Sequence, residues 1–355
     1  MNKTRRKLIW LSLGLLAILI RFSVGQDSNF IEQFYSRGLF IYIRKALDFI
    51  NSISFFPLLY LLLLLVVVHI FRGSIRLFQG KSSWKDALLS VGAFFGGTIF
   101  IFLLLWGFNY ARLPLEKQIN LEVKALSFEE LETNLRKAYN QTITARNAFR
   151  ADITAVSKAD LPDELAVEMR RELENLLTEF DYPTGFNVKA QKLFPKGILL
   201  RFSTLGVYFP WTGECNIDGG LHPLEQPFVY AHELAHGFGI TDEGSCNFLA
   251  YLTCIRSSNA LVRYAGHFEY FTTLAYNYRR YRPDALHELF PSLPQNVRND
   301  WAAVLENGAL YPDIMPRLRN ATYNTYLRAQ GIEEGIQNYN RVLMLVQAYE
   351  AKMNN

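Results

Sequence analysis

The chain has 355 residues, half of them hydrophobic and 14% aromatic, with a formal net charge of +4. This length allows two or three domains of ordinary size. The charge is modest and no Lys/Arg cluster is interleaved with aromatic residues, so we expect no nucleic-acid partner. The cysteines, Cys215, Cys246 and Cys254, are too few for a disulfide framework and indicate buried or free thiols. One disulfide bridge remains an alternative if this part of the chain is exported.

The hydrophobic residues are concentrated before residue 110. They predict three transmembrane helices, at about 8–24, 55–71 and 88–108, because a bilayer crossing needs ~20 apolar residues. The first run follows a basic stretch and also resembles a signal peptide, but Arg21 interrupts its end and no Ala-x-Ala site follows. We therefore favour an uncleaved membrane helix.

The segment between the first two runs, residues 26–54, has apolar residues at helical spacing with charged residues between them. This pattern predicts an amphipathic helix near the membrane surface. A loop helix packed on the membrane helices would give the same pattern.

Basic residues lie at the N-terminus and in the loop after the second apolar run. By the positive-inside rule we expect both segments to be cytoplasmic. Three crossings then place the rest of the chain on the other side. The predicted domains are a membrane anchor over 1–111 and an extracytoplasmic domain over 112–355. In a bacterium with two membranes the second domain would be periplasmic.

The second domain is predicted to be mostly helical with a small sheet, an α+β class. Ser127 and Glu130 have the spacing of a capping box before a helix that continues toward Phe149. Further helices are expected from about 160 to 180, and over 244–255, 259–281, 295–307 and 335–352. Residues 197–217 indicate strands and turns, because they combine β-branched and aromatic residues with glycines. Pro210 within this stretch favours an edge strand, which is either a substrate-binding edge for an extended peptide or an ordinary edge strand.

Residues 232–236 read His-Glu-Leu-Ala-His. On a helix, His232 and His236 share one face and can bind one metal ion, while Glu233 stands beside them as a general base. A zinc site needs a third ligand, and Glu243 follows after a glycine-containing turn, at the start of the next helix. Asn247, one turn later, would orient a ligand histidine. Asp242 is the competing ligand, or simply the N-cap of that helix.

Other histidines are weaker candidates. His287 and Glu288 begin a similar motif, but Pro291 stands in place of the second histidine. His222 and His267 are interpreted as structural. The alternative for the motif itself is a pair of structural histidines, or a degenerate site without metal.

The His-Glu-Leu-Ala-His motif followed by Glu243-x-x-x-Asn247 resembles the gluzincin side of the zinc metallopeptidases. More broadly, the chain resembles a bacterial membrane family, domain of unknown function 3810. The shared features are the three N-terminal crossings, residues 106–110, 206–210 and 247–251, and the C-terminal stretches 326–331 and 338–342. The resemblance implies a zincin-like fold in a bacterial inner (cytoplasmic) membrane protein, and it brings no substrate with it.

These observations predict a membrane-anchored zinc metallopeptidase that hydrolyses peptide or protein substrates outside the cytoplasm. Zn²⁺ would be held by His232, His236 and Glu243, and Glu233 would take the proton of the attacking water. Tyr339 is our candidate for stabilising the oxyanion, with Tyr326 and Arg341 as alternatives. The competing hypothesis is a non-catalytic metal-binding sensor or scaffold. The sequence disfavours an intramembrane protease and a transporter, and it gives no oligomeric state.

Overall fold

The computed structural model describes residues 3–25, 27–332 and 335–354. It divides into two compact units. Unit 1 comprises Met1–Leu113 and Phe209–Glu214, and unit 2 comprises Pro114–Tyr208 and Cys215–Asn355. The chain is mostly helical with one small three-stranded sheet, as the α+β prediction expected.

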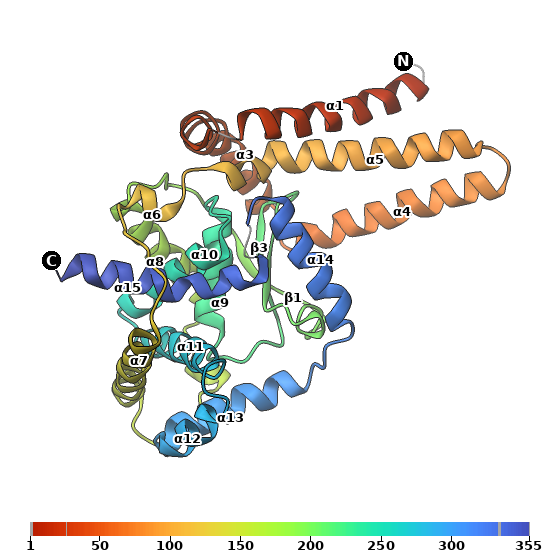
Figure 1. Cartoon of the computed structure of the whole chain (residues 1–355). Coiled ribbons are helices and arrows are strands. Elements are labelled where there is room, and N and C mark those ends of the chain that lie inside the picture. The colour runs from red at the N-terminus through yellow and green to blue at the C-terminus, as the bar shows by residue number, and fades with distance from the viewer. Residues whose placement is uncertain (1–2, 26, 333–334, 355) are drawn as a thin grey trace. The chain divides into compact units, whose positions relative to one another are not determined.

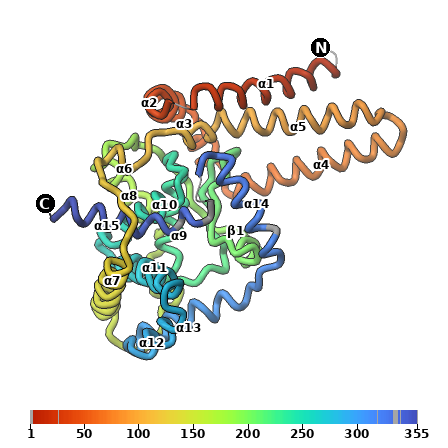
Figure 2. The backbone as a smooth tube through the Cα atoms, viewed as in Figure 1, coloured from red at the N-terminus to blue at the C-terminus, as the bar shows by residue number. Residues whose placement is uncertain are grey.

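Unit 1 contains three helices long and apolar enough to cross a membrane: α1 (Lys3–Val24), α4 (Leu58–Phe78) and α5 (Trp84–Leu105). Figures 1 and 2 show them as the long rods of this unit. The prediction of three such helices is confirmed. α1 and α5 approach closely at two glycines, since a Cβ on Gly14 would lie 2.5 Å from the Cα of Gly96. Small residues permit such close packing of membrane helices.

The connection between α1 and α4 is helical. It consists of α2 (Ser28–Phe30), the wider-turned helix η1 (Ile31–Leu39) and α3 (Phe40–Ser52). The short helix η2 (Gly107–Ala111) follows α5. Trp106, just after α5, is buried and packs edge-on against Tyr110 at 5.2 Å between ring centroids.

The loop Phe209–Glu214 completes unit 1. The Glu214 carboxylate, fully buried, accepts hydrogen bonds from the backbone N–H groups of Leu58 at 2.7 Å and Leu59 at 2.9 Å. These N–H groups begin α4 and have no partner within the helix. A carboxylate at a helix N-terminus also complements the helix dipole. Glu214 therefore caps α4, a role that Pro57 before it cannot fill with a side chain.

Unit 2 is built mainly from helices around a buried apolar core that includes Met169, Leu173 and Phe271. The predicted capping box is confirmed at the start of α7 (Phe128–Phe149). The side chains of Ser127 and Glu130 each accept a hydrogen bond from the backbone N–H of the other residue. The helices α12 and α14 were not predicted, and the helix expected over 335–352 begins as a 3-10 turn. The helices are α6 (Leu115–Gln118), α7 (Phe128–Phe149), η3 (Lys158–Asp160), α8 (Leu165–Glu179), α9 (Gln226–Gly237), α10 (Glu243–Arg256), α11 (Ala260–Tyr278), α12 (Ala285–Ser292), α13 (Gln295–Ala309), α14 (Pro316–Ala329), η5 (Gly335–Asn340) and α15 (Arg341–Met353).

The sheet has the strand order β1–β3–β2, with β1 at Ala190–Leu193, β2 at Gly206–Phe209 and β3 at Glu214–Asp218. β1 pairs in parallel with β3. The four-residue connection makes β2 antiparallel to β3, since parallel neighbours need a longer crossover. β2 is thus an edge strand, as the sequence indicated.

Within residues 197–217, predicted as strands and turns, the first part forms the 3-10 turn η4 (Leu200–Phe202) and the strands follow it. The cause is Asp218, whose carboxylate accepts hydrogen bonds from the N–H groups of Gly197 at 2.7 Å and Leu199 at 2.7 Å. These bonds curl the backbone around one side chain, so it cannot extend along a neighbouring strand.

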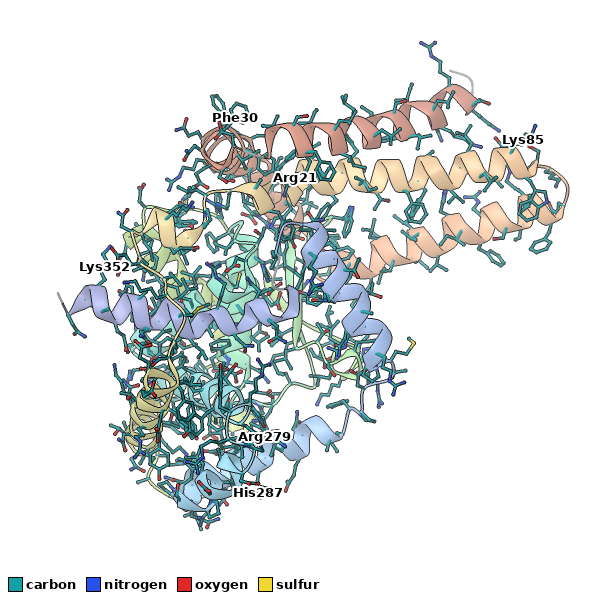
Figure 3. The ribbon with its side chains drawn as sticks, viewed as in Figure 1. Arg21, Phe30, Lys85, Arg279, His287 and Lys352 are labelled. Atoms are coloured by element: carbon teal, nitrogen blue, oxygen red, sulfur yellow. The ribbon has the colours of Figure 1, made fainter. Side chains whose placement is uncertain are left out.

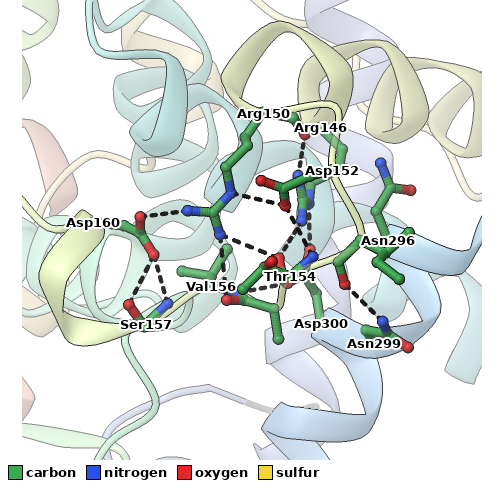
Figure 4. Close-up of polar contacts among 12 residues, drawn as sticks. Arg146, Arg150, Asp152, Thr154, Val156, Ser157, Asp160, Asn296, Asn299 and Asp300 are labelled. Atoms are coloured by element: carbon green, nitrogen blue, oxygen red, sulfur yellow. Dashed lines mark hydrogen bonds and ion pairs between the residues drawn. The ribbon is translucent and has the colours of Figure 1, made fainter.

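A buried polar network joins helices α7, α11 and α13 of unit 2 (Figure 4). Arg146 and Asp300 are fully buried and pair at 2.6 Å, and Tyr264 donates its hydroxyl to the same carboxylate at 2.8 Å. The second oxygen of Asp300 accepts the N–H of Val156 at 2.7 Å. Arg146 also donates to the carbonyl of Thr154 at 2.7 Å. Each charge in this network has partners, as a stable buried ion pair requires.

Candidate metal centre

The helix that carries the motif, α9, is buried along its whole length. Pro227 stands at its first turn, where the missing N–H costs nothing. Apolar residues on its other faces pack into the core, so Ala231, Leu234 and Ala235 are fully buried. This packing fixes the rotation of the helix and therefore the direction of its two histidines.

A glycine turn ends α9 and orients the second histidine. Gly239 has a φ of +86°, a conformation that favours glycine. The turn is closed by hydrogen bonds from Gly239 N–H to His236 O and from Ile240 N–H to Ala235 O. It brings the carbonyl oxygen of Ile240 to 2.8 Å from Nδ1 of His236. The Nδ1–H of His236 therefore donates to this carbonyl, which leaves Nε2 available as a metal ligand.

His232, His236 and Glu243 form a buried cluster whose ligand atoms all lie within 4.8 Å of one another. Oε2 of Glu243 is 3.1 Å from Nε2 of His232 and 3.4 Å from Nε2 of His236. Tetrahedral ligands about 2.0–2.1 Å from zinc are separated by roughly 3.3 Å. Two nitrogens and one carboxylate oxygen at these separations fit a catalytic zinc site, in which three protein ligands leave one position open.

Asn247 lies where its spacing predicted. Its Oδ1 is 2.8 Å from Nδ1 of His232, so His232 donates Nδ1–H to the amide and directs Nε2 toward Glu243. Both histidines are thus held by a hydrogen bond on one ring nitrogen and face the cluster with the other. Such bonds fix the tautomer and raise the basicity of a ligand imidazole.

Glu243 is surrounded by positive and donor groups. Burial alone would raise the pKa of its carboxyl, but the charge of His236 and the hydrogen bonds from both imidazoles outweigh burial and hold the pKa well below its usual value. Tyr323 on α14 also donates its hydroxyl to Oε1 of Glu243 at 2.8 Å. The carboxylate is therefore ionised, which is the form that binds a metal.

Asp242 is the N-cap of α10 and not a member of the ligand cluster. Its carboxylate accepts from the N–H of Ser245 at 2.7 Å, and also from Asn338 at 2.7 Å and Arg341 at 3.1 Å. Asn338 in turn accepts the N–H of Gly244 at 3.0 Å. Asn338 and Arg341 thus fix the N-terminus of α10, where Glu243 stands.

Glu233 is 5% exposed and lies against the edge strand, because a Cβ at Gly206 would come 2.6 Å from its Oε1. The backbone N–H of Tyr208 hydrogen-bonds the carboxylate. Among the described residues, none partners its other oxygen, Oε2. Burial raises the pKa of Glu233 to about 7, although His232 and His236 oppose the shift. A carboxyl with this pKa can both accept and return a proton near neutral pH.

The other candidates lie elsewhere. The side chain of Tyr339 is outside the described part of the structure. Arg341 pairs with Asp242 and Glu116, and Tyr326 stacks on Tyr323 at 6.2 Å. His287 is exposed on α12 (Figure 3). The sequence reasoning missed Tyr323, which stands three residues before Tyr326 on the same helix.

The three cysteines are buried thiols that form no disulfide, as predicted. Cys246 lies 3.4 Å from Nδ1 of His236, and Cys215 donates its thiol to the carbonyl of Glu233 at 3.0 Å. Burial raises the pKa of the Cys246 thiol to about 12. This thiol faces Nδ1 of His236, whereas the ligand cluster forms around Nε2 of the same ring.

Comparison with known proteins gives one family. The family model described as "Protein of unknown function (DUF3810)" matches residues 35–347. The chain belongs to the DUF3810 family. No curated protein and no solved structure matches this chain. In this DUF3810 member the matched region begins within η1 and contains α4, α5, the ligand cluster and the residues that fix α10.

Proposed function

We propose that this protein is a membrane-anchored, zinc-dependent metallopeptidase that hydrolyses peptide bonds in protein or peptide substrates. The observation that carries the proposal is the carboxylate of Glu233, buried beside three metal-ligand side chains with one oxygen unpartnered among the described residues. An unsatisfied buried carboxylate destabilises a fold. A purely structural metal site has no use for it, whereas hydrolysis needs a base at that place.

His232, His236 and Glu243 would hold the ion. A zinc ion there would act as a Lewis acid toward the scissile carbonyl and would lower the pKa of water to about 7. Glu233 would accept the proton of the attacking water through Oε2 and pass it to the leaving amine. The free edge of β2 supports an extended peptide as substrate, because a sheet edge offers backbone hydrogen bonds to an added strand.

The proposed location is a bacterial inner membrane, with the N-terminus in the cytoplasm and unit 2 outside it. Two observations within unit 1 support this topology. Lys7 on α1 and Asp86 on α5 form an ion pair at 2.5 Å, so the basic start of α1 and the start of α5 share one end of the helical array. Lys85 lies at that same end in Figure 3. Basic residues gathered at one end of membrane helices favour the cytoplasmic side.

The test uses the full-length protein purified in detergent. We expect one zinc per chain in the wild type, retained in Glu233→Gln and lost in Glu243→Ala. Peptidase activity against a mixed peptide library should fall by about 10²–10⁴-fold in Glu233→Gln, the usual contribution of a general base. Exposed Glu129→Gln on α7 is the matched control and should change neither quantity.

Full zinc occupancy in Glu243→Ala would refute the ligand assignment. Unchanged hydrolysis in Glu233→Gln would refute the mechanism. A wild type that binds zinc but cleaves nothing would favour the competing role of a metal-binding sensor or scaffold.

A further inference from the structure

The helical connection in unit 1, residues 28–56, has its polarity inverted. Several of its charged and polar residues are buried, including Glu32 at 5% exposure and Arg44 at 0%. Several of its large apolar residues are exposed, including Tyr42 at 73% and Phe49 at 68%. A helix on the surface of a soluble protein shows the opposite arrangement. Exposure of this outer face to water is therefore unfavourable.

The buried face is fully occupied by contacts within unit 1. Glu32 binds Arg112 through two hydrogen bonds, at 2.9 and 2.7 Å, and also binds Arg37 at 3.0 Å. Arg44 pairs with Asp48 at 2.7 Å. Further polar contacts join Ser36 to Asn109 and Asn51 to the carbonyl oxygen of Thr212. These bonds fix which face of the helix looks outward.

The outer face is a continuous apolar stripe. Tyr42, Phe49 and Ile53 are separated by seven and four residues, so they lie on one side of α3 and its end. Phe34 on η1 and Phe55 before α4 extend the stripe, with exposures of 63% and 95%. Figure 3 shows Phe30 on the outside of the same segment. Lys45 is also exposed on this face, with a side chain long enough to reach lipid headgroups.

The apolar helices on either side of this segment also expose large apolar residues. Leu19 and Phe22, near the end of α1, are 63% and 68% exposed, and Leu64 on α4 is 58% exposed. The connection begins at Ser28, close to the end of α1, and stops just before Leu58, where α4 starts. Its two ends therefore belong to the same end of the helical array, so the segment does not cross the bilayer.

Tyr35 fixes the position of η1 along the length of α5. Its hydroxyl donates to the carbonyl oxygen of Leu104 at 2.9 Å, in the last turn of α5. The η1 helix thus lies beside the last turn of an apolar helix, at the level where hydrocarbon gives way to headgroups. Aromatic side chains are enriched at that level.

We propose that residues 28–56 form an interfacial helix whose apolar stripe (Phe34, Tyr42, Phe49, Ile53 and Phe55) is embedded in the lipid bilayer. The partner of this surface is lipid, and the polar face is turned inward to unit 1. This inference is independent of the proposed peptidase activity.

The experiment uses full-length protein in phosphatidylcholine/phosphatidylglycerol vesicles. Tyr42→Cys, Phe49→Cys and Ile53→Cys are each labelled with an environment-sensitive fluorophore, and quenching by spin-labelled lipid is measured. The three native cysteines are buried thiols, so a wild-type sample corrects for their background labelling. Glu129→Cys, exposed on α7, is the matched control.

We expect lipid quenching at positions 42, 49 and 53 to exceed that at position 129 by at least about twofold, because an embedded interfacial face contacts acyl chains directly. Quenching equal to that at position 129 would overturn the proposal. Protection from lipid together with cross-linking between copies at position 49 would also overturn it, and would assign the stripe to a protein interface.

Discussion

The two units treat buried charge differently. In unit 1 the buried carboxylates are engaged: Glu32 by Arg112, Asp48 by Arg44, and Glu214 by the N-terminus of α4. Unit 2 does the same at Asp300, but Glu233 keeps an oxygen without a partner among the described residues. A paired buried charge holds the neighbouring elements in place, whereas an unpaired buried charge lowers the stability of the fold. The difference separates the side chains that hold the protein together from the one we propose for chemistry.

The largest effect on stability is expected from Asp300→Ala. This change leaves Arg146 buried without its carboxylate and removes the acceptor of Tyr264, which should cost about 3–5 kcal/mol of unfolding free energy. Urea unfolding of the full chain in detergent measures it. The exposed pair Arg136–Glu132 is the control, and Arg136→Ala should cost less than about 1 kcal/mol. Equal losses in the two variants would show that burial of the Asp300 pair has no special weight.

A smaller effect is expected from Asn247→Ala, which removes the acceptor of His232 Nδ1–H without removing a ligand. Zinc affinity should fall by about 10–100-fold, the usual consequence of losing such an orienting bond. Competition with a chromogenic chelator measures the affinity. Tyr323→Phe removes one hydrogen bond to Glu243 and should weaken zinc binding by less than about tenfold. Unchanged affinity in Asn247→Ala would mean that packing alone orients His232.

The smallest effect is expected from pH. Burial lowers the pKa of His267 from 6.5 to about 4 in the folded protein. Below pH 6.5 the unfolded chain takes up this proton and the folded chain does not, so stability falls as the pH drops from 6.5 toward 4. With solvent screening at this half-buried ring, the loss should be about 1–2 kcal/mol. His267→Phe should lose less stability over that range, and an identical pH dependence would exclude His267 as its source.

Local signals in the sequence predicted much of this molecule. The three apolar helices, the capping box at Ser127 and the edge position of β2 follow from composition, spacing and turn residues. The ligand cluster follows from two helical spacings, His232 to His236 and Glu243 to Asn247. Each of these depends on residues close together in the chain.

What the sequence did not predict depends on distant partners. Tyr323 meets Glu243 across 80 residues, and Asp218 curls the turn at Leu200 from 18 residues away. Residues 28–56 show a further limit. Their periodicity revealed two faces but not which face points inward, because that depends on Arg112 and Asn109, which lie beyond two later helices.

The contacts of Asn338 and Arg341 with the N-terminus of α10 have a consequence for the order in which this protein folds. Asn338 and Arg341 are 94 and 99 residues distant from the groups they bind at Gly244 and Asp242. The ribosome therefore makes both histidines and Glu243 long before it makes the residues that fix Glu243 in place. Until then Glu243 lies at a helix end that lacks its contacts with Asn338 and Arg341. The cluster of His232, His236 and Glu243 therefore takes its final geometry only after Arg341 has joined the folded domain.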